Sequence, residues 1–333
     1  MQNFKIISEK NLLFNLKQFQ KKRVCAMVKS NAYGHGIKEI VSMLSDKVDY
    51  FGVVSENEGK QVRRWTNKPI LVCGRVQNFR VCKMNNLEFM IENETDLQRA
   101  IVCDVGDKCH LKIDSGMNRF GAKSELQMIL IEKMLKENKI KLKSIATHFH
   151  CLEDGQETLK NYDTFLRLKK YISQQPAICF GGSNVIDCPF DYDMIRVGIG
   201  LYGYERKDVK PIMKIESYIA KSFYAKSGES IGYGNNYVVK KSGLYAVVPI
   251  GYGDGLFRNL SGKFCIEING RKFHSVGKIC MDVFFVKIDN SVKVGDKVVV
   301  MQNAEQMAKS VNTISYEILT NFSKCRAKTK IQQ

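Results

Sequence analysis

Eight short apolar runs, spaced so that a helix fits between each pair, constrain the fold of this chain more than any other feature of its sequence. The runs are residues 24–29, 50–54, 70–74, 87–91, 110–114, 145–149, 177–181 and 194–198. In the intervening segments, such as residues 125–138 and 156–174, apolar side chains return every three or four positions. Alternating strands and helices are typical of parallel βαβ units. Eight such units predict a (β/α)8 barrel of the TIM type over residues 9–211.

After about residue 211 the pattern changes to short alternating runs separated by Gly and Asn turns. We expect strands at residues 217–225, 245–250, 264–268 and 283–288, and helices near residues 305–310 and 315–322. This pattern predicts a mainly antiparallel β domain over residues 212–333.

The composition restricts where such a protein works. The 333 residues, 44% of them hydrophobic, suffice for one large and one smaller domain. No run approaches the roughly 20 consecutive apolar residues of a membrane span, and the N-terminal residues MQNFKI lack the apolar segment of a signal peptide. The eleven cysteines are dispersed, odd in number and mostly inside apolar runs, which is typical of reduced, buried thiols. We therefore expect a cytoplasmic protein without a membrane partner.

The formal net charge of +18 raises the question of nucleic-acid binding. The lysines and arginines are scattered, however, and their clusters fall where helices would expose a solvated face. No zinc-ligand spacing, RNP-like aromatic motif or basic tail accompanies them. We therefore expect the basic surface of an enzyme that uses neither a nucleic acid nor a metal.

Polar side chains stand at the ends of several of the eight runs, where a barrel of this kind builds its active site. They are Lys29, Arg75, Asp114, His148, Ser183 and Arg196. Lys29 differs from the others because the glycine-punctuated segment SNAYGHG (residues 30–36) follows it at once. A lysine at a strand end is usually solvated and takes no part in chemistry. The flanking segment therefore decides how Lys29 is interpreted.

The segment VCAMVKSNAYGHG (residues 24–36) resembles the cofactor-lysine motif of bacterial alanine racemases, which are pyridoxal 5'-phosphate (PLP) enzymes of fold type III. The segment HLKIDSGMNRFG (residues 110–121) resembles the fifth-strand signature of that family, and matches continue in the family's order to about Tyr316. The resemblance implies that Lys29 carries PLP and that the enzyme racemises alanine, supplying D-alanine for cell-wall peptidoglycan. It also implies that residues 1–8 form an edge strand of the second domain.

The resemblance further implies which residues of the barrel hold the cofactor. Arg119 would lie beside the phenolic oxygen of PLP and bind the substrate carboxylate, and a carbamylated Lys112 would orient it. A Gly-Gly-Ser turn that opens a helix is a ready phosphate site, and Ser183 lies in such a turn. The family pattern implies a cofactor-binding set of Lys29, Tyr33, Arg119, His148, Ser183, Arg196, Gly198, Ile199 and Tyr316.

In the second domain, Tyr233 matches the catalytic tyrosine of the family, and Tyr252, Met281 and Asp282 match residues near the substrate. In the family these residues approach the site from a partner subunit, so a homodimer with shared active sites is implied. Racemisation needs a proton donor on each face of the α-carbon, and Lys29 and Tyr233 would be the two.

Three alternatives stay open. A racemase for serine, or one of broad specificity, would share this scaffold, because the residues that size the side-chain pocket are not identified. A fold-type III amino-acid decarboxylase would place a carboxylate at the pyridine nitrogen, where the match here is Arg196. A non-catalytic PLP-binding protein would consist of the barrel alone. The C-terminus also departs from the family, because Arg326 is the remnant of an arginine-and-proline signature.

Overall fold

The structure is a computed structural model, and it describes residues 2–333. The chain divides into two compact units, which are described here one at a time. The barrel unit comprises Asn15–Ala32 and Ile37–Leu201. The sheet unit comprises the described residues up to Phe14, with Tyr33–Gly36 and Tyr202–Gln333.

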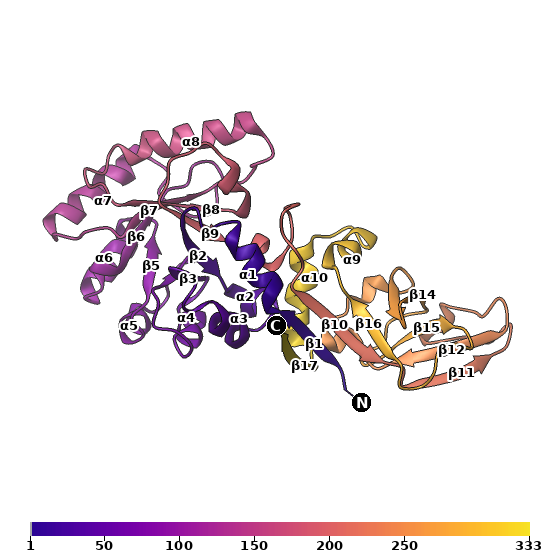
Figure 1. Cartoon of the computed structure of the whole chain (residues 1–333). Coiled ribbons are helices and arrows are strands. Elements are labelled where there is room, and N and C mark those ends of the chain that lie inside the picture. Colours follow the sequence, from indigo (N-terminus) through magenta and orange to yellow (C-terminus); the bar gives the residue numbers. More distant parts are fainter. Residues whose placement is uncertain (1) are drawn as a thin grey trace. The chain divides into compact units, whose positions relative to one another are not determined.

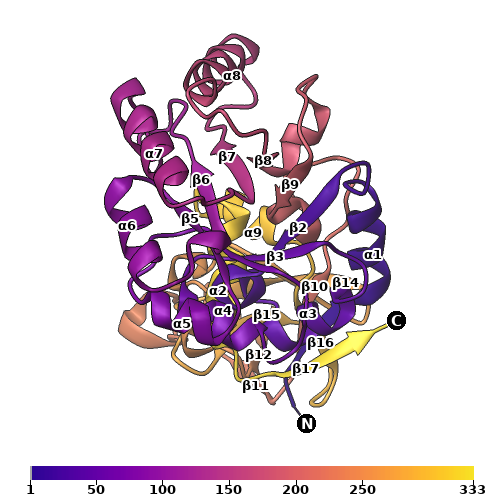
Figure 2. The same ribbon diagram turned by 90° about the vertical axis from the view of Figure 1, so that its left-hand side faces the viewer.

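Within the described residues, eight parallel strands of the barrel unit close on themselves, and this confirms the predicted fold class. The strands follow chain order round the barrel, and β9 returns to pair with β2, with Val24 opposite Ile195. Helices cover the outside of the strands (Figures 1 and 2). The strands are β2 (Arg23–Met27), β3 (Tyr50–Val53), β4 (Ile70–Val72), β5 (Glu88–Ile91), β6 (Cys109–Lys112), β7 (Ser144–His148), β8 (Ala177–Gly181) and β9 (Met194–Val197).

Five of the helices around the barrel begin at a polar residue that caps them. The side chains of Ser55, Asn78, Asn93, Ser124 and Asp154 each accept a backbone N–H of the first turn that follows. The helices of the barrel unit are α3 (Ile37–Leu44), α4 (Glu56–Val62), α5 (Phe79–Met84), α6 (Glu94–Val102), α7 (Glu125–Glu137) and α8 (Gly155–Lys169), and α1 (Glu9–Lys17) is divided between the two units at Phe14. Their apolar faces are buried, as α3 illustrates with Ile40, Val41 and Leu44.

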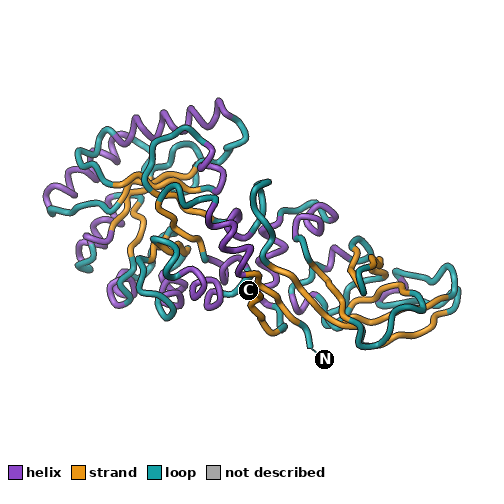
Figure 3. Tube along the Cα trace, in the orientation of Figure 1, coloured by secondary structure: helices purple, strands orange, loops and turns teal. Residues whose placement is uncertain are grey.

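The sheet unit contains a nine-stranded sheet within the described residues, in the order β11-β12-β15-β14-β13-β16-β10-β1-β17 (Figure 3). Every neighbouring pair is antiparallel except β1 and β17. The strands are β1 (Phe4–Ser8), β10 (Met213–Tyr218), β11 (Lys221–Ala225), β12 (Gly243–Val248), β13 (Cys265–Ile268), β14 (Arg271–Val276), β15 (Phe284–Ile288), β16 (Lys297–Met301) and β17 (Lys328–Gln332). Two short helices, α9 (Ala304–Ser310) and α10 (Ser315–Asn321), lie close to their predicted positions.

The structure corrects two expectations for the sheet unit. Residues 1–8 were expected to form an edge strand, but β17 pairs with β1 on its outer side and occupies the edge. Residues 217–225 were expected to form one strand, but the chain turns at residues 219–220 and divides them between β10 and β11. Strands β14, β16 and β17 were not predicted; lysine and arginine interrupt the apolar patterns of β14 and β17, whereas β16 contains an apolar run that the prediction left out. Among residues 2–333, no helix combines the length and the apolar character that crossing a bilayer requires.

Candidate active site

The backbone that follows Lys29 has an unusual conformation. In the segment labelled α2 (Lys29–Tyr33), Ser30, Asn31 and Ala32 all have φ of 53–54° and ψ of 47–52°. These are left-handed helical values, which cost residues other than glycine roughly 1–2 kcal/mol each. Such strain persists only where surrounding structure enforces it, and it concentrates at functional sites. The turn after Lys29 therefore marks this strand end as a site.

Hydrogen bonds hold this left-handed turn in place. The amide of Ala32 donates to the carbonyl oxygen of Val28 at 2.9 Å. A carboxylate oxygen of Glu58 accepts the amide of Ser30 at 2.7 Å, and the side-chain oxygen of Asn31 accepts the amide of Ile37 at 2.9 Å. These contacts fix the backbone that carries Lys29.

Arg196 is buried in the barrel unit and is held by three acceptors, none of which carries a charge. Nη1 donates to the carbonyl oxygen of Cys179 at 3.0 Å and to its Sγ at 3.0 Å, and Nη2 donates to the carbonyl oxygen of Thr147 at 2.7 Å. Gly181 makes room for this arrangement, because a Cβ there would collide with Arg196 Nη2 and His148 Nδ1. The guanidinium and the imidazole therefore approach each other across a residue without a side chain.

Several cations influence one another at this end of the barrel. Burial and then the charge of Arg196 lower the pKa of Lys112 to about 8. Burial, followed by the charges of Arg196, Arg119, Lys112 and Lys29, lowers the pKa of His148 to about 3. His148 is therefore neutral at ordinary pH. The strand ends form a positively charged site that would attract an anionic ligand.

Ser183 and Gly200 bring together the two turns that were predicted to hold a phosphate. Ser183 opens the short helix η2 (Ser183–Asp187), and Gly200 lies in η3 (Ile199–Tyr202), directly after Gly198 and Ile199. The hydroxyl oxygen of Ser183 accepts the amide of Gly200 at 3.0 Å, so its O–H remains a donor for a ligand. A Cβ at Gly200 would lie 2.9 Å from that oxygen. The donors and the close approach of the two turns fit a phosphate group.

Arg119 lies in the loop that follows β6. Asp114 shapes this loop, because its Oδ1 accepts the amides of Gly116 and Asn118, each at 3.0 Å. Arg119 is exposed, and it lines a pocket of about 240 Å³ together with Asp114 and Glu92. The ammonium of Lys112, at the end of β6, lies 5.1 Å from the ring centroid of Phe120.

The sheet unit contains the remaining predicted residues, in two groups. The first group is aromatic. The ring of Tyr33 lies 4.8 Å from that of Tyr202 and 6.0 Å from that of Tyr316. The hydroxyl of Tyr316 donates to a carboxylate oxygen of Glu205 at 2.9 Å. The two tyrosines that were predicted to contact the phosphate are therefore neighbours, and Glu205 is a partner that the sequence did not reveal.

The second group is exposed. The exposed fractions are 71% for Tyr233, 42% for Tyr252 and 55% for Met281. The loops of Tyr252 and Met281 are joined, because the amide of Tyr252 donates to the carbonyl oxygen of Cys280 at 3.1 Å. Asp282 follows Met281 in the same loop. Tyr233, Tyr252 and Met281 are therefore accessible to solvent.

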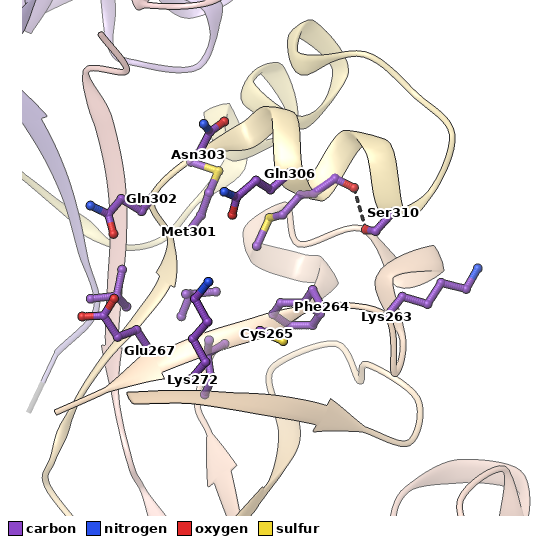
Figure 4. Close-up of a pocket in the computed structure, with 14 residues that line it drawn as sticks. Lys263, Phe264, Cys265, Glu267, Lys272, Met301, Gln302, Asn303, Gln306 and Ser310 are labelled. Atoms are coloured by element: carbon purple, nitrogen blue, oxygen red, sulfur yellow. Dashed lines mark hydrogen bonds between the residues drawn. The ribbon is translucent and has the colours of Figure 1, made fainter. Parts of the chain in front are cut away.

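A separate groove of about 260 Å³ lies in the sheet unit between strands β13, β14 and β16 and helix α9. Figure 4 shows Lys263, Lys272, Glu267 and Gln306 around it. None of the predicted site residues lines this groove. We therefore do not place the active site there.

Sequence reasoning missed the residues that support the predicted ones. Cys179 and Thr147 hold Arg196, Gly181 leaves room for it, and Arg326 contacts both Asp254 and Asp282. A thiol inside an apolar strand is normally part of the core, so Cys179 gave no signal. Arg326 was noticed only as a departure from a family pattern.

Comparisons with known proteins give matches over most of the chain. Residues 7–206 match the family model "Alanine racemase, N-terminal domain", and residues 212–330 match "Alanine racemase, C-terminal domain". An alanine racemase from Francisella philomiragia subsp. philomiragia is 30% identical over 95% of this chain and 96% of the relative.

Some solved structures are similar to this chain over its whole length. The alanine racemase of Clostridium difficile 630 has a TM-score of 0.90 and 30% identity, over 100% of this chain and 96% of that one. The alanine racemase of Bartonella henselae with covalently bound pyridoxal phosphate also has a TM-score of 0.90. The identity to the Bartonella henselae protein is 24% over 100% of both chains, and this similarity shows that the two proteins share a fold.

Proposed function

This chain belongs to the alanine racemase family, and we propose that it interconverts L-alanine and D-alanine with PLP as its cofactor. The observation that carries the proposal is the positively charged strand-end site, in which Lys29 precedes a strained left-handed turn. A cationic, partly buried site suits a cofactor with a phosphate and a phenolic oxygen.

The residues of the barrel unit fit PLP. We propose that Lys29 binds the cofactor covalently, as a lysine does in many enzymes that use carbonyl cofactors. Ser183 and the amides of Gly198 and Ile199 would hold the phosphate. The hydroxyls of Tyr33 and Tyr316 are proposed as further phosphate donors. When bound, PLP would withdraw electrons from the α-carbon of the amino acid and so make its C–H acidic.

Two proton carriers are proposed, one for each face of the α-carbon. Lys29 would serve one face, and Tyr233 of a second copy of the chain would serve the other, each taking and returning a proton in alternate directions. The exposure of Tyr233 supports this role, because a second copy has access to it. The proposed assembly is therefore a homodimer with shared active sites.

The charged residues have separate proposed roles. Arg119 would bind the substrate carboxylate, together with the amide of Met281 and with Tyr252 and Asp282 of a second copy of the chain. Arg196 would face the ring nitrogen of the cofactor, with His148 beside it. Because a guanidinium does not release its proton, Arg196 would leave that nitrogen unprotonated and so limit carbanion lifetime and side reactions.

Lys112 is proposed to be carbamylated. A carbamate forms from a neutral amine and CO2, and a pKa near 8 supplies neutral amine close to physiological pH. The carbamate would then hold the guanidinium of Arg119 in place. We further propose a cytoplasmic enzyme whose D-alanine serves cell-wall peptidoglycan.

The deciding experiment is circular dichroism of L-alanine and D-alanine, and then of serine, incubated with purified protein and PLP. We expect both alanine enantiomers to racemise, and serine to react more slowly. Bound cofactor is expected to absorb near about 420 nm. A protein that shows no such band after addition of PLP, and leaves both alanine solutions unchanged, does not have this function.

A variant tests the second proton carrier. Tyr233→Phe removes the phenol, and loss of a general acid or base should slow racemisation roughly 100-fold or more. Tyr224→Phe is the matched control, because Tyr224 is also exposed, at 61%, and has no proposed role in the site. Equal rates for the two variants would exclude Tyr233 as a proton carrier.

A further inference from the structure

We infer that Arg326 is a positioning residue for the substrate, because it joins the loop of Tyr252 to the loop of Met281 and Asp282. The inference rests on the proposed function, in which these residues contact the amino acid. It assigns a role to the C-terminal segment, where the sequence departs from the family pattern.

Arg326 makes a bidentate ion pair with the carboxylate of Asp254 and a further contact with the carboxylate of Asp282. Its Nε and Nη2 lie 2.7 Å and 2.8 Å from the two oxygens of Asp254. The same Nη2 lies 2.8 Å from Oδ1 of Asp282. Paired guanidinium–carboxylate contacts fix direction as well as distance. Arg326 therefore sets the orientation of Asp254 relative to Asp282.

Asp254 needs the positive charge of Arg326, because Asp254 is buried, with 1% of its surface exposed. Burial alone would raise the pKa of the Asp254 carboxyl, but hydrogen bonds from Arg326 and from the amide of Gly251 bring it below the ordinary value. A buried carboxylate that loses its cation is left without compensation. Removal of Arg326 would therefore disturb the turn that contains Asp254.

That turn carries Tyr252 and is in direct backbone contact with the loop of Met281. The amide of Gly253 donates to the carbonyl oxygen of Met281 at 2.9 Å. A Cβ at Gly251 would collide with the carbonyl oxygens of Cys280 and Met281, so only glycine allows this approach. The two loops touch along their backbones, and Arg326 connects the carboxylates at their ends.

Arg326 is itself held by regular structure. It follows α10 and the short helix η7 (Phe322–Lys324), and one residue, Ala327, separates it from the start of β17. The amide of Lys328, at the start of β17, donates to the carbonyl oxygen of Asn3 at 3.1 Å, and Lys328 pairs with Phe4 of β1. The polar C-terminal strand therefore anchors the arginine that joins the two loops.

The expected consequence is a change in substrate binding with little change in the proton-transfer steps. Lys29 and Tyr233, the two proposed proton carriers, lie outside the two loops. A loss of uniform binding raises KM and leaves kcat unchanged. Lysine is a poor substitute for Arg326, because a single ammonium cannot make the bidentate contact with Asp254.

The experiment compares Arg326→Ala and Arg326→Lys with Arg271→Ala in the full-length holoenzyme. Arg271 is the matched control, since it pairs with Asp289 at the surface of the same sheet unit. We expect Arg326→Ala to raise KM for alanine about tenfold with kcat within threefold of wild type. Added guanidinium should lower that KM again. Arg326→Lys should give an intermediate KM, and Arg271→Ala should match wild type.

Two further measurements separate the possible outcomes. Hydrogen exchange should show faster exchange in residues 251–255 and 278–283 of Arg326→Ala, whether or not the protein racemises alanine. Asp282→Asn should raise KM in the wild-type background and add little in Arg326→Ala. Unchanged exchange in both loops overturns the inference, as does an unchanged KM or an equal fall of kcat and kcat/KM. An inactive wild type with faster exchange in Arg326→Ala would instead contradict the proposed function alone.

Discussion

The barrel unit has two buried polar layers, one at each end of its strands, and they differ in how their charges are compensated. At the start of the strands, Nε2 of His110 lies 2.8 Å from a carboxylate oxygen of Glu88, and its Nδ1 lies 2.7 Å from the hydroxyl of Ser144. At the other end, Arg196 donates only to carbonyls and a thiol, close to Lys112.

The difference separates structure from function. In the first layer, burial lowers the pKa of His110, so a neutral imidazole bridges a carboxylate and a hydroxyl, and every partner belongs to the chain. In the second layer, positive charge remains that the neighbouring acceptors do not neutralise. Buried charge is costly unless it is paired. The first layer therefore stabilises the barrel, and the second is adapted to an anionic ligand.

The difference between the two layers predicts that Lys29→Ala has the largest effect on racemisation. The variant removes the group that is proposed to bind the cofactor and to carry a proton. We expect racemisation to fall at least about 1,000-fold, while the melting temperature of the protein without PLP stays within a few degrees. Circular dichroism of alanine measures the rate. Lys133→Ala, at an exposed position of α7, is the control. Activity above one tenth of wild type would contradict the assignment.

Glu88→Ala tests the opposite layer. It leaves His110 buried without its carboxylate and should lower the free energy of unfolding by about 3 kcal/mol. Urea denaturation measures this loss, and kcat/KM at 25 °C should stay within a few-fold of wild type. Glu137→Ala, at an exposed end of α7, should change stability by less than about 0.5 kcal/mol. A variant as stable as the control would show that the layer is not a stabilising network.

Lys112→Met should stabilise the protein without PLP, in buffer free of CO2, by about 2 kcal/mol at pH 7. The pKa of Lys112 is lowered from its ordinary 10.5 to about 8 in the folded state. Between these values the unfolded chain binds more protons, so wild-type stability rises with pH and the advantage of Lys112→Met fades from pH 8 to pH 10.5. Urea denaturation across this range checks the sign. An advantage that grows with pH would be inconsistent with a depressed pKa.

Cys179→Ser should have the smallest effect, because a hydroxyl still accepts a hydrogen bond from Arg196 but reaches less far than a thiol. We expect kcat/KM to fall about threefold, together with a shift in the absorbance of the bound cofactor. Cys265→Ser is the control, because Cys265 is exposed in the sheet unit. If Cys179→Ser and the control share one spectrum and one rate, the thiol does not position Arg196.

The chain's local patterns determined the barrel and the identity of its central lysine. Strand and helix periods follow from which side chains can be buried, so eight apolar runs specified eight strands. The motif after Lys29 is also a local feature, because its residues are consecutive in the sequence. Four consecutive positions in it take left-handed φ values next to the strand end. The fold class was therefore predicted from the strand and helix pattern, and Lys29 and Arg196 were singled out because their segments resemble those of a known family.

Only the tertiary structure decided what surrounds these residues. Cys179 on β8 contacts Arg196 on the neighbouring strand β9, and Arg326 contacts Asp254, which lies 72 positions away in the chain. Strand β17 is polar and pairs with β1 from the opposite terminus. Contacts between residues far apart in sequence leave no periodic trace in either segment, because each depends on where the whole fold brings its partner. The sequence therefore predicted the groups at the centre of the proposed site, and the fold decided which neighbours hold them.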